Sequence, residues 1–201
     1  MIINERTSRH ENVIAAARQL LIAARTAPKA RGVDIIEVAL IEGDELRQLA
    51  DRMVEIGNER NRPSFIRDAG NVLQSEAVVV IGTHIQPMSL NCGHCGFPSC
   101  AEVPADVPCV MNSIDVGIAL GSACATAADL RLDTRVMYSI GVAAEELGFL
   151  GNDVHITVGI AISASSKSPF FDRPTKSFKL YISKIRSHII ARTDFFCVFL
   201  E

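Results

Sequence analysis

The sequence has no tryptophan, only two tyrosines and few aromatic residues of any kind. Aromatics make up 5% of the chain, whereas hydrophobic residues make up 48%. The 201 residues are enough for one domain with a core of its own, so disulfide crosslinks are not needed for stability. That core has to be built from aliphatic and small side chains, chiefly Ala, Val, Ile and Leu.

The sequence also lacks an excess of positive charge and long hydrophobic runs. A formal net charge of −3 does not indicate a nucleic-acid partner or an anionic membrane surface. Glu5 and Glu11 stand where a signal peptide would carry its basic start. The most apolar segment, 116–128, lies between Asp115 and Asp129 and is shorter than a bilayer requires. We therefore expect a cytoplasmic protein with no membrane and no nucleic-acid partner.

Cysteine is concentrated in one stretch, LNCGHCGFPSCAEVPADVPC at residues 90–109. In a reducing compartment, clustered cysteines indicate metal ligands or redox groups before they indicate disulfides. The pattern C-x2-C-x4-C-x8-C puts two thiols on one tight turn and two on the following loop, and iron–sulfur cubanes are held by four thiolates in this way. Glycines after two of the cysteines leave room for N–H groups to approach the sulfurs. The sequence predicts a 4Fe-4S site held by Cys92, Cys95, Cys100 and Cys109.

Structural zinc is the alternative interpretation of this stretch. Four-cysteine zinc sites usually use two short pairs, and the x8 gap, which contains Pro104 and Pro108, fits that pattern poorly. His94 lies inside the loop and is expected to be solvated or outside the ligand set. Cys124 and Cys197 are expected to be packed apolar thiols.

Hydrophobic periodicity predicts alternating helices and strands, typical of an α/β or α+β domain. Ser8 with Glu11 indicates a capping box at the start of the first helix. Gly117, Gly121 and Ala125 recur on one face of the fourth helix, and this face suits close helix packing inside the protein or in a dimer. The expected helices are 8–25, 42–57, 64–74, 113–130 and 142–151, and the expected strands are 34–41, 77–82, 135–141 and 154–163.

The segments NERTSRHENV, ARTAPKARGVD, FIRDAGNV, LNCGHCGFPSC, DVGIALGSA, AADLRLDTRVMYSIG and FFDR together resemble a family of ferredoxin-domain proteins of unknown function. The cysteine motif resembles the cluster module of iron–sulfur subunits in the anaerobic carbon-monoxide dehydrogenase/acetyl-CoA pathway and in membrane redox complexes. The framework is similar to the flavin nitroreductases. This resemblance implies an α+β fold, with a nitroreductase-like mixed β-sheet flanked by helices and an inserted iron–sulfur loop at 90–110. The domain would cover residues 1–173, and 174–201 would be a C-terminal tail or dimer arm.

The nitroreductase resemblance also implies an FMN site. Arg6 and Ser8 match an Arg-x-Ser motif, and a helix N-terminus with a basic and a hydroxyl side chain suits a phosphate. The alternative is that Ser8 is only an N-cap and Arg6 a solvated charge. Arg131 and Asp133 also replace small residues and leave less room for a flavin. The implied FMN contacts are Arg6, Ser8, Lys29, Tyr138, Ser139 and Lys167, with Arg173 as a fainter candidate.

Two functional hypotheses follow. The first is a homodimeric, FMN-dependent iron–sulfur oxidoreductase with an unknown small electron acceptor or redox partner protein. The second is a ferredoxin-like electron-transfer or redox-sensing module that has no flavin and no catalytic activity.

Overall fold

The computed structural model describes residues 1–171, and Met1–Phe170 form one compact unit. The tail predicted at 174–201, the flavin candidate Arg173 and the thiol of Cys197 lie outside the described residues. The helices are α1 (Glu5–Thr26), α2 (Gly43–Glu59), α3 (Pro63–Val72), α4 (Val110–Asp129) and α5 (Tyr138–Glu146), with short 3-10 turns at Ala30–Gly32 and Cys100–Glu102. The strands are β1 (Ile36–Ile41), β2 (Ala77–His84), β3 (Asp133–Met137) and β4 (Val154–Ser163).

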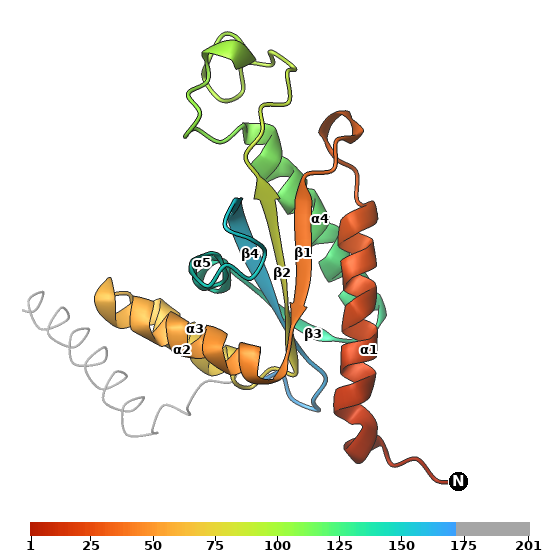
Figure 1. The fold of residues 1–201 in the computed structure, drawn as a ribbon. Coiled ribbons are helices and arrows are strands. Elements are labelled where there is room, and N and C mark those ends of the chain that lie inside the picture. Colours follow the sequence, from red (N-terminus) through yellow and green to blue (C-terminus); the bar gives the residue numbers. More distant parts are fainter. Residues whose placement is uncertain (172–201) are drawn as a thin grey trace, which may run out of the picture. The chain divides into compact units, whose positions relative to one another are not determined.

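The four strands form one sheet in the order β1-β2-β4-β3 (Figure 1). Every pairing among the described residues is antiparallel, with Val80 opposite Ala39 on one side and Gly159 on the other. The α+β architecture predicted from the sequence is confirmed, although the sheet is antiparallel where a mixed sheet was expected.

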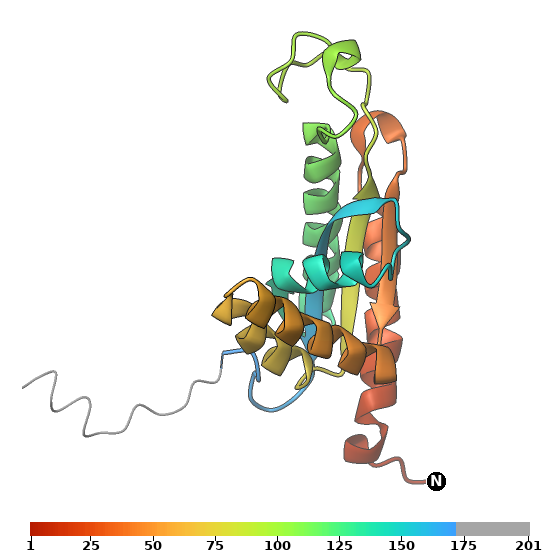
Figure 2. The ribbon, with the colours of Figure 1, turned by 60° about the vertical axis from the view of Figure 1, so that its left-hand side comes forward.

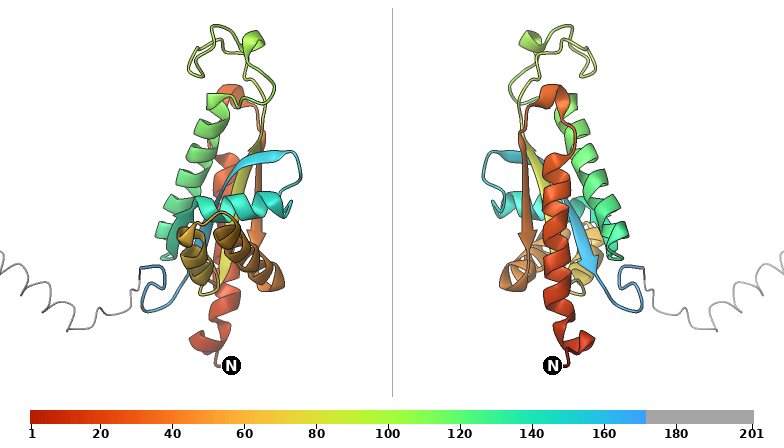
Figure 3. Two further views of the ribbon diagram at one scale, coloured as in Figure 1. Left: turned by 90° about the vertical axis from the view of Figure 1, so that its left-hand side faces the viewer. Right: turned by 90° about the vertical axis from the view of Figure 1, so that its right-hand side faces the viewer.

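Helices cover both faces of the sheet, α1 and α4 on one side and α2, α3 and α5 on the other (Figure 3). The side chains of β2 alternate between the two layers, because successive residues of a strand point to opposite faces. Val78 and Val80 pack with α2, α3 and α5, whereas Val79 and Ile81 pack with α1 and α4. This double burial explains why β2 is a continuous apolar run.

The first helix begins at Glu5, before the start that the capping box at Ser8 predicts, so the capping-box prediction is wrong. Asn4 is the N-cap, and its Oδ1 accepts a hydrogen bond from the Arg6 N–H at 2.9 Å. Ser8 lies inside α1, where its hydroxyl donates to the Asn4 carbonyl at 3.1 Å. The side chain of Asn4, and not that of Ser8, therefore caps the N-terminus of α1.

The prediction of an extended segment at 135–141 is correct only as far as Met137, after which α5 begins at Tyr138. The reason is a close contact between α5 and β4. A Cβ on Gly141 would lie 1.7 Å from the Thr157 carbonyl oxygen, so only glycine lets the helix approach the strand there. Packing against β4 thus outweighs the strand character of the local sequence.

The apolar segment around 116–128 is also longer than expected. Within residues 1–171, α4 alone is long and apolar enough to cross a membrane by length and composition, with 20 residues. The expectation that it is too short is therefore corrected. Core helices of soluble proteins pass the same test, and α4 buries Val116, Ala119 and Ala123 against the sheet.

Candidate metal-binding site

The cysteine loop is the connection between β2 and α4, residues 85–109, and it extends beyond the end of the sheet (Figures 1 and 2). Apart from the single turn Cys100–Glu102, it contains no helix or strand. Its conformation therefore depends on turns, side-chain hydrogen bonds and a small apolar base.

All four cysteines line one pocket in this loop. Cys109 is buried, Cys95 and Cys100 are partly buried, and Cys92 is exposed. The thiols predicted to act together are thus brought together, with one at the base of the pocket and one at the surface. Apolar side chains complete the lining, among them Met88, Leu90, Phe97 and Val103.

Glycine gives the first half of the loop its turn. Gly93 and Gly96 have φ of 70° and 88°, and the Gly96 N–H donates to the Gly93 carbonyl at 2.9 Å. Residues with side chains rarely adopt such φ values, so the two glycines are needed for backbone conformation. The turn lies between Cys92 and Cys100 and carries Cys95. His94, within the turn, is exposed, as expected for a solvated residue.

Asn91 makes a reciprocal contact with Cys100 that no pattern in the sequence had indicated. Its N–H donates to Sγ of Cys100 at 3.3 Å, and its side-chain Oδ1 accepts from the Cys100 N–H at 2.8 Å. The one feature of the sequence that could have indicated this contact is an asparagine directly before the first cysteine. Asparagine tolerates left-handed backbone, and the φ of Asn91 is 48°.

Contacts at the base hold the loop on the domain. Arg31 donates to the Met88 carbonyl at 2.9 Å, and the buried amide of Asn112 bonds to both backbone groups of Gln86. Ile35, Met88 and Cys109 form a small apolar cluster beneath the pocket. Cys109 is also the N-cap of α4, and the free N–H groups at a helix start favour negatively charged groups such as thiolates.

No three His, Cys, Asp or Glu side chains among residues 1–171 converge closely enough to hold a single metal ion. A mononuclear zinc site needs its donors on one ion. In a cubane each thiolate binds a different iron, so the sulfurs stand farther apart. All four cysteines nevertheless line one pocket, and four thiolates are the donor set of a cubane.

The predicted flavin residues Arg6 and Ser8 lie in the first turn of α1, at the opposite end of the domain from the cysteine loop (Figure 1). Lys29 follows the last turn of the same helix. At 1.5 Å per residue, the 22 residues of α1 span about 33 Å. One chain therefore does not bring Lys29 together with Arg6 and Ser8.

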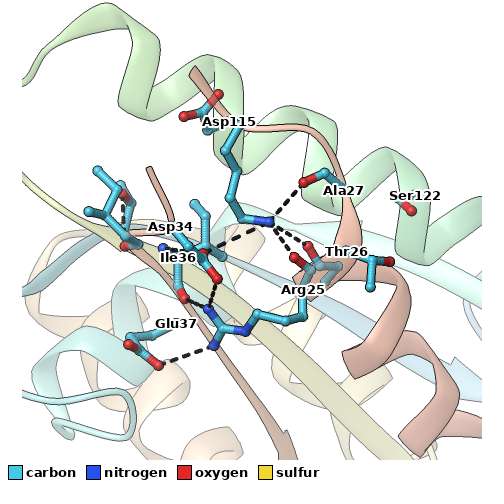
Figure 4. Close-up of polar contacts among 12 residues, drawn as sticks. Arg25, Thr26, Ala27, Asp34, Ile36, Glu37, Asp115 and Ser122 are labelled. Atoms are coloured by element: carbon cyan, nitrogen blue, oxygen red, sulfur yellow. Dashed lines mark hydrogen bonds and ion pairs between the residues drawn. The ribbon is translucent and has the colours of Figure 1, made fainter. Parts of the chain in front are cut away.

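Lys29 is used to cap α1. Its ammonium donates to the carbonyls of Ala24 at 3.3 Å, Arg25 at 2.5 Å and Ala27 at 2.9 Å, and its side chain is 5% exposed. Arg25 bonds from the same helix end to Asp34 at 2.9 Å (Figure 4). The ammonium of Lys29 thus neutralises the helix C-terminus, which carries partial negative charge.

Tyr138 and Ser139 connect α5 to α3. The buried hydroxyl of Ser139 donates to Oδ2 of Asp68 at 2.7 Å, and the Tyr138 ring packs edge-on against Phe65 with centroids 5.5 Å apart. Lys167 lies in the segment after β4, where its carbonyl accepts a hydrogen bond from Ser165. The side chain of Ser139 is therefore already used inside the domain.

Comparison with known proteins finds one relative that is matched over its entire length. The chain is 41% identical over 186 residues to an uncharacterized protein of Archaeoglobus fulgidus, and the match covers 88% of this chain and all of the relative. A family described as "Uncharacterized protein containing a ferredoxin domain (DUF2148)" matches residues 105–173.

Solved structures with a similar fold are oxidoreductases by name. A putative NADH dehydrogenase/NAD(P)H nitroreductase from Bacteroides thetaiotaomicron gives a TM-score of 0.52 at 11% identity, covering 81% of this chain and 79% of its own. Nitroreductase A from Vibrio parahaemolyticus gives 0.51 at 12% identity, covering 82% and 64%. The NADPH:FMN oxidoreductase of Vibrio harveyi gives 0.50 at 13% identity, covering 82% and 65%. At these identities the comparison establishes the nitroreductase fold.

Proposed function

Because the chain belongs to the same family as the Archaeoglobus fulgidus protein and matches the ferredoxin-domain family over residues 105–173, we propose that it is an iron–sulfur redox protein. We further propose that one 4Fe-4S cluster is held by Cys92, Cys95, Cys100 and Cys109. The observation that carries the proposal is that these four thiols line a single pocket.

The surroundings of the thiols support a cluster in preference to zinc. The four cysteines line one pocket, and the eight-residue gap between Cys100 and Cys109 departs from the two short pairs usual in four-cysteine zinc sites. Cys109 is held in the apolar cluster with Ile35 and Met88, which limits water at the inner side of the site. A cluster bound there would supply one-electron transfer.

The exposed side of the pocket is where electrons would enter and leave. Cys92 is exposed at this side, and Leu90 beside it is 44% exposed. A redox partner protein or a small electron acceptor would approach this surface. The electron-transfer or redox-sensing function is the candidate that the geometry supports best, because it requires only groups that lie together in one chain.

A second candidate function is that of an FMN-dependent oxidoreductase, and the nitroreductase fold favours it. Three of the six side chains assigned to FMN already have hydrogen-bond partners within the chain. Lys29 is bonded to the end of α1, Ser139 to Asp68, and Ser8 to Asn4. FMN would therefore have to be held by the remaining candidates Arg6, Tyr138 and Lys167, by backbone groups or by residues of two chains.

We also propose that the chain forms a homodimer through the exposed face of α4. Ile114 and Ile118 are 42% and 39% exposed on this face, and a methyl group placed on Gly117 or Gly121 would have no neighbouring atom within 4 Å. The two glycines are thus not used for a close internal contact. A second copy of α4 could approach closely along them.

Anaerobic purification from the cytoplasm, where we expect the protein to reside, tests these proposals. Iron and sulfide near four per chain, with a spectrum that bleaches on reduction, would support the cluster. Stoichiometric FMN in the same sample would support the oxidoreductase. Zinc in place of iron would contradict the proposal.

A further inference from the structure

Asn91 is bonded to Cys100 through both its backbone and its side chain. The Asn91 N–H donates to Sγ of Cys100 at 3.3 Å, while its Oδ1 accepts from the Cys100 N–H at 2.8 Å. The two bonds join the residue before the first cysteine to the third cysteine and close the loop between them. Asn91 thereby sets the position of Cys100 relative to the turn that carries Cys95.

The backbone of Asn91 adopts a conformation that few residues tolerate. Its φ of 48° lies in the left-handed region, which is unfavourable for most L-residues and less so for asparagine. Residues 85–99 contain no helix or strand that would impose this conformation. Asn91 itself is exposed, so close packing does not impose it either. The reciprocal bonds to Cys100 are the contacts that stabilise it.

A hydrogen bond to a ligand sulfur raises the reduction potential of an iron–sulfur site. Reduction adds negative charge, and an N–H dipole directed at the sulfur stabilises that charge. The Asn91 N–H is directed at Cys100 in this way.

We infer, on the premise of the proposed cluster, that Asn91 is a positioning residue that fixes Cys100 and raises the reduction potential of the site. The side-chain amide maintains the left-handed backbone, and that backbone presents the N–H to the sulfur. Asn91 thereby affects both the retention of the cluster and its potential.

Three variants separate these roles. Asn91→Ala removes the side-chain acceptor and disfavours the positive φ. Asn91→Gly removes the acceptor but keeps the positive φ accessible. Asn61→Ala is the matched control, since Asn61 also has a positive φ, 51°, but lies in the turn between α2 and α3 and lines no part of the cysteine pocket.

The measurements are iron per chain and the midpoint potential, obtained from anaerobic redox titration of the whole protein. For Asn91→Ala we expect an equilibrium constant for one-electron reduction about tenfold lower, which corresponds to about 59 mV. For Asn91→Gly we expect a smaller fall, and for Asn61→Ala no change. Loss of iron from Asn91→Ala, with Asn61→Ala fully loaded, would also support the positioning role.

Full iron content and an unchanged potential in Asn91→Ala would overturn the inference. An equal loss of iron in Asn91→Ala and Asn61→Ala would also overturn it, because the effect would then be general to left-handed asparagines. A wild-type protein that carries no iron would instead refute the proposed function, and the role of Asn91 would fall with it.

Discussion

Asn112 and Gln86 are joined by two hydrogen bonds between α4 and the start of the cysteine loop. The Gln86 N–H donates to Oδ1 of Asn112 at 3.1 Å, and Nδ2 of Asn112 donates to the Gln86 carbonyl at 3.0 Å. Asn112 is fully buried and lies in the first turn of α4, the helix whose N-cap is Cys109. One amide thus ties the first residues of the loop to the helix that follows its last cysteine.

Replacing Asn112 with alanine is expected to destabilise the protein. Both bonds are lost, and the backbone groups of Gln86 lose their partners, so the free energy of unfolding should fall by about 1–3 kcal/mol. Urea denaturation of the cluster-free protein measures this. Asn12→Ala serves as the control, because Asn12 is exposed and its bond to Ser8 is long, at 3.4 Å. An equal loss of unfolding free energy in both variants would show that the two bonds between Asn112 and Gln86 do not stabilise the protein in this way.

Replacing any one of the four loop cysteines with serine is expected to abolish or greatly reduce cluster binding, whereas the Cys124→Ser variant should still bind the cluster. Cys124 lies on α4 outside the pocket, half-buried against the apolar cluster that α1 and α4 share. Iron and sulfide analysis after anaerobic purification gives the comparison. Full iron content in Cys92→Ser would show that the proposed ligand set is wrong.

Cys124 is also expected to react slowly with alkylating reagents. Burial raises the pKa of its thiol, so a smaller fraction is thiolate near neutral pH than for an ordinary cysteine. Its alkylation in the cluster-free protein, followed by mass spectrometry, should accelerate as the pH rises through the shifted pKa. A rate equal to that of the exposed Cys92 at neutral pH would contradict the prediction.

Glu146 is expected to make part of the stability depend on pH. Partial burial alone would raise its pKa, but hydrogen bonds and charge from Arg52 and Arg60 outweigh burial and hold the pKa below the ordinary value of 4.5. A carboxyl with a lowered folded-state pKa stabilises the fold above the unfolded pKa, and this stabilisation is lost as the pH falls through the folded pKa.

The variant Glu146→Gln should therefore lose stability at neutral pH and show a shallower decline below about pH 4.5. Thermal unfolding between about pH 3 and pH 7, at roughly one-unit steps, measures the difference. Glu11→Gln, on the exposed side of α1, provides the comparison. Parallel curves for wild type and Glu146→Gln would exclude this contribution.

Ile118→Asp is expected to convert the proposed dimer to a monomer, because it places a charge in the middle of the apolar face of α4. Light scattering coupled to size exclusion measures the mass. Ile22→Asp is the matched control, since Ile22 is 65% exposed on α1. A wild-type protein that is already monomeric, or dissociation of both variants alike, would contradict the assigned interface.

Most helices and strands, and the gathering of the four cysteines in one loop, could be predicted from the sequence. The apolar runs of β2 and β4 and the helical periodicity of α2 and α3 depend on local spacing, and the structure places these elements within a few residues of their predicted bounds. The gathering of the four cysteines also followed from spacing, because the loop that carries them is short.

The hydrogen-bond partners of the polar side chains could not be predicted in this way and become visible only in the folded chain. Lys29 turns to the carbonyls of α1, and Ser139 bonds to Asp68, 71 positions away. Gly141 makes a close contact with Thr157 that favours helix at 138–141. A hydrogen bond or close contact depends on where the fold puts its second partner, and a one-dimensional pattern carries no such information. The bond between Asn91 and Cys100 belongs to the same class, because it exists only once the loop has closed.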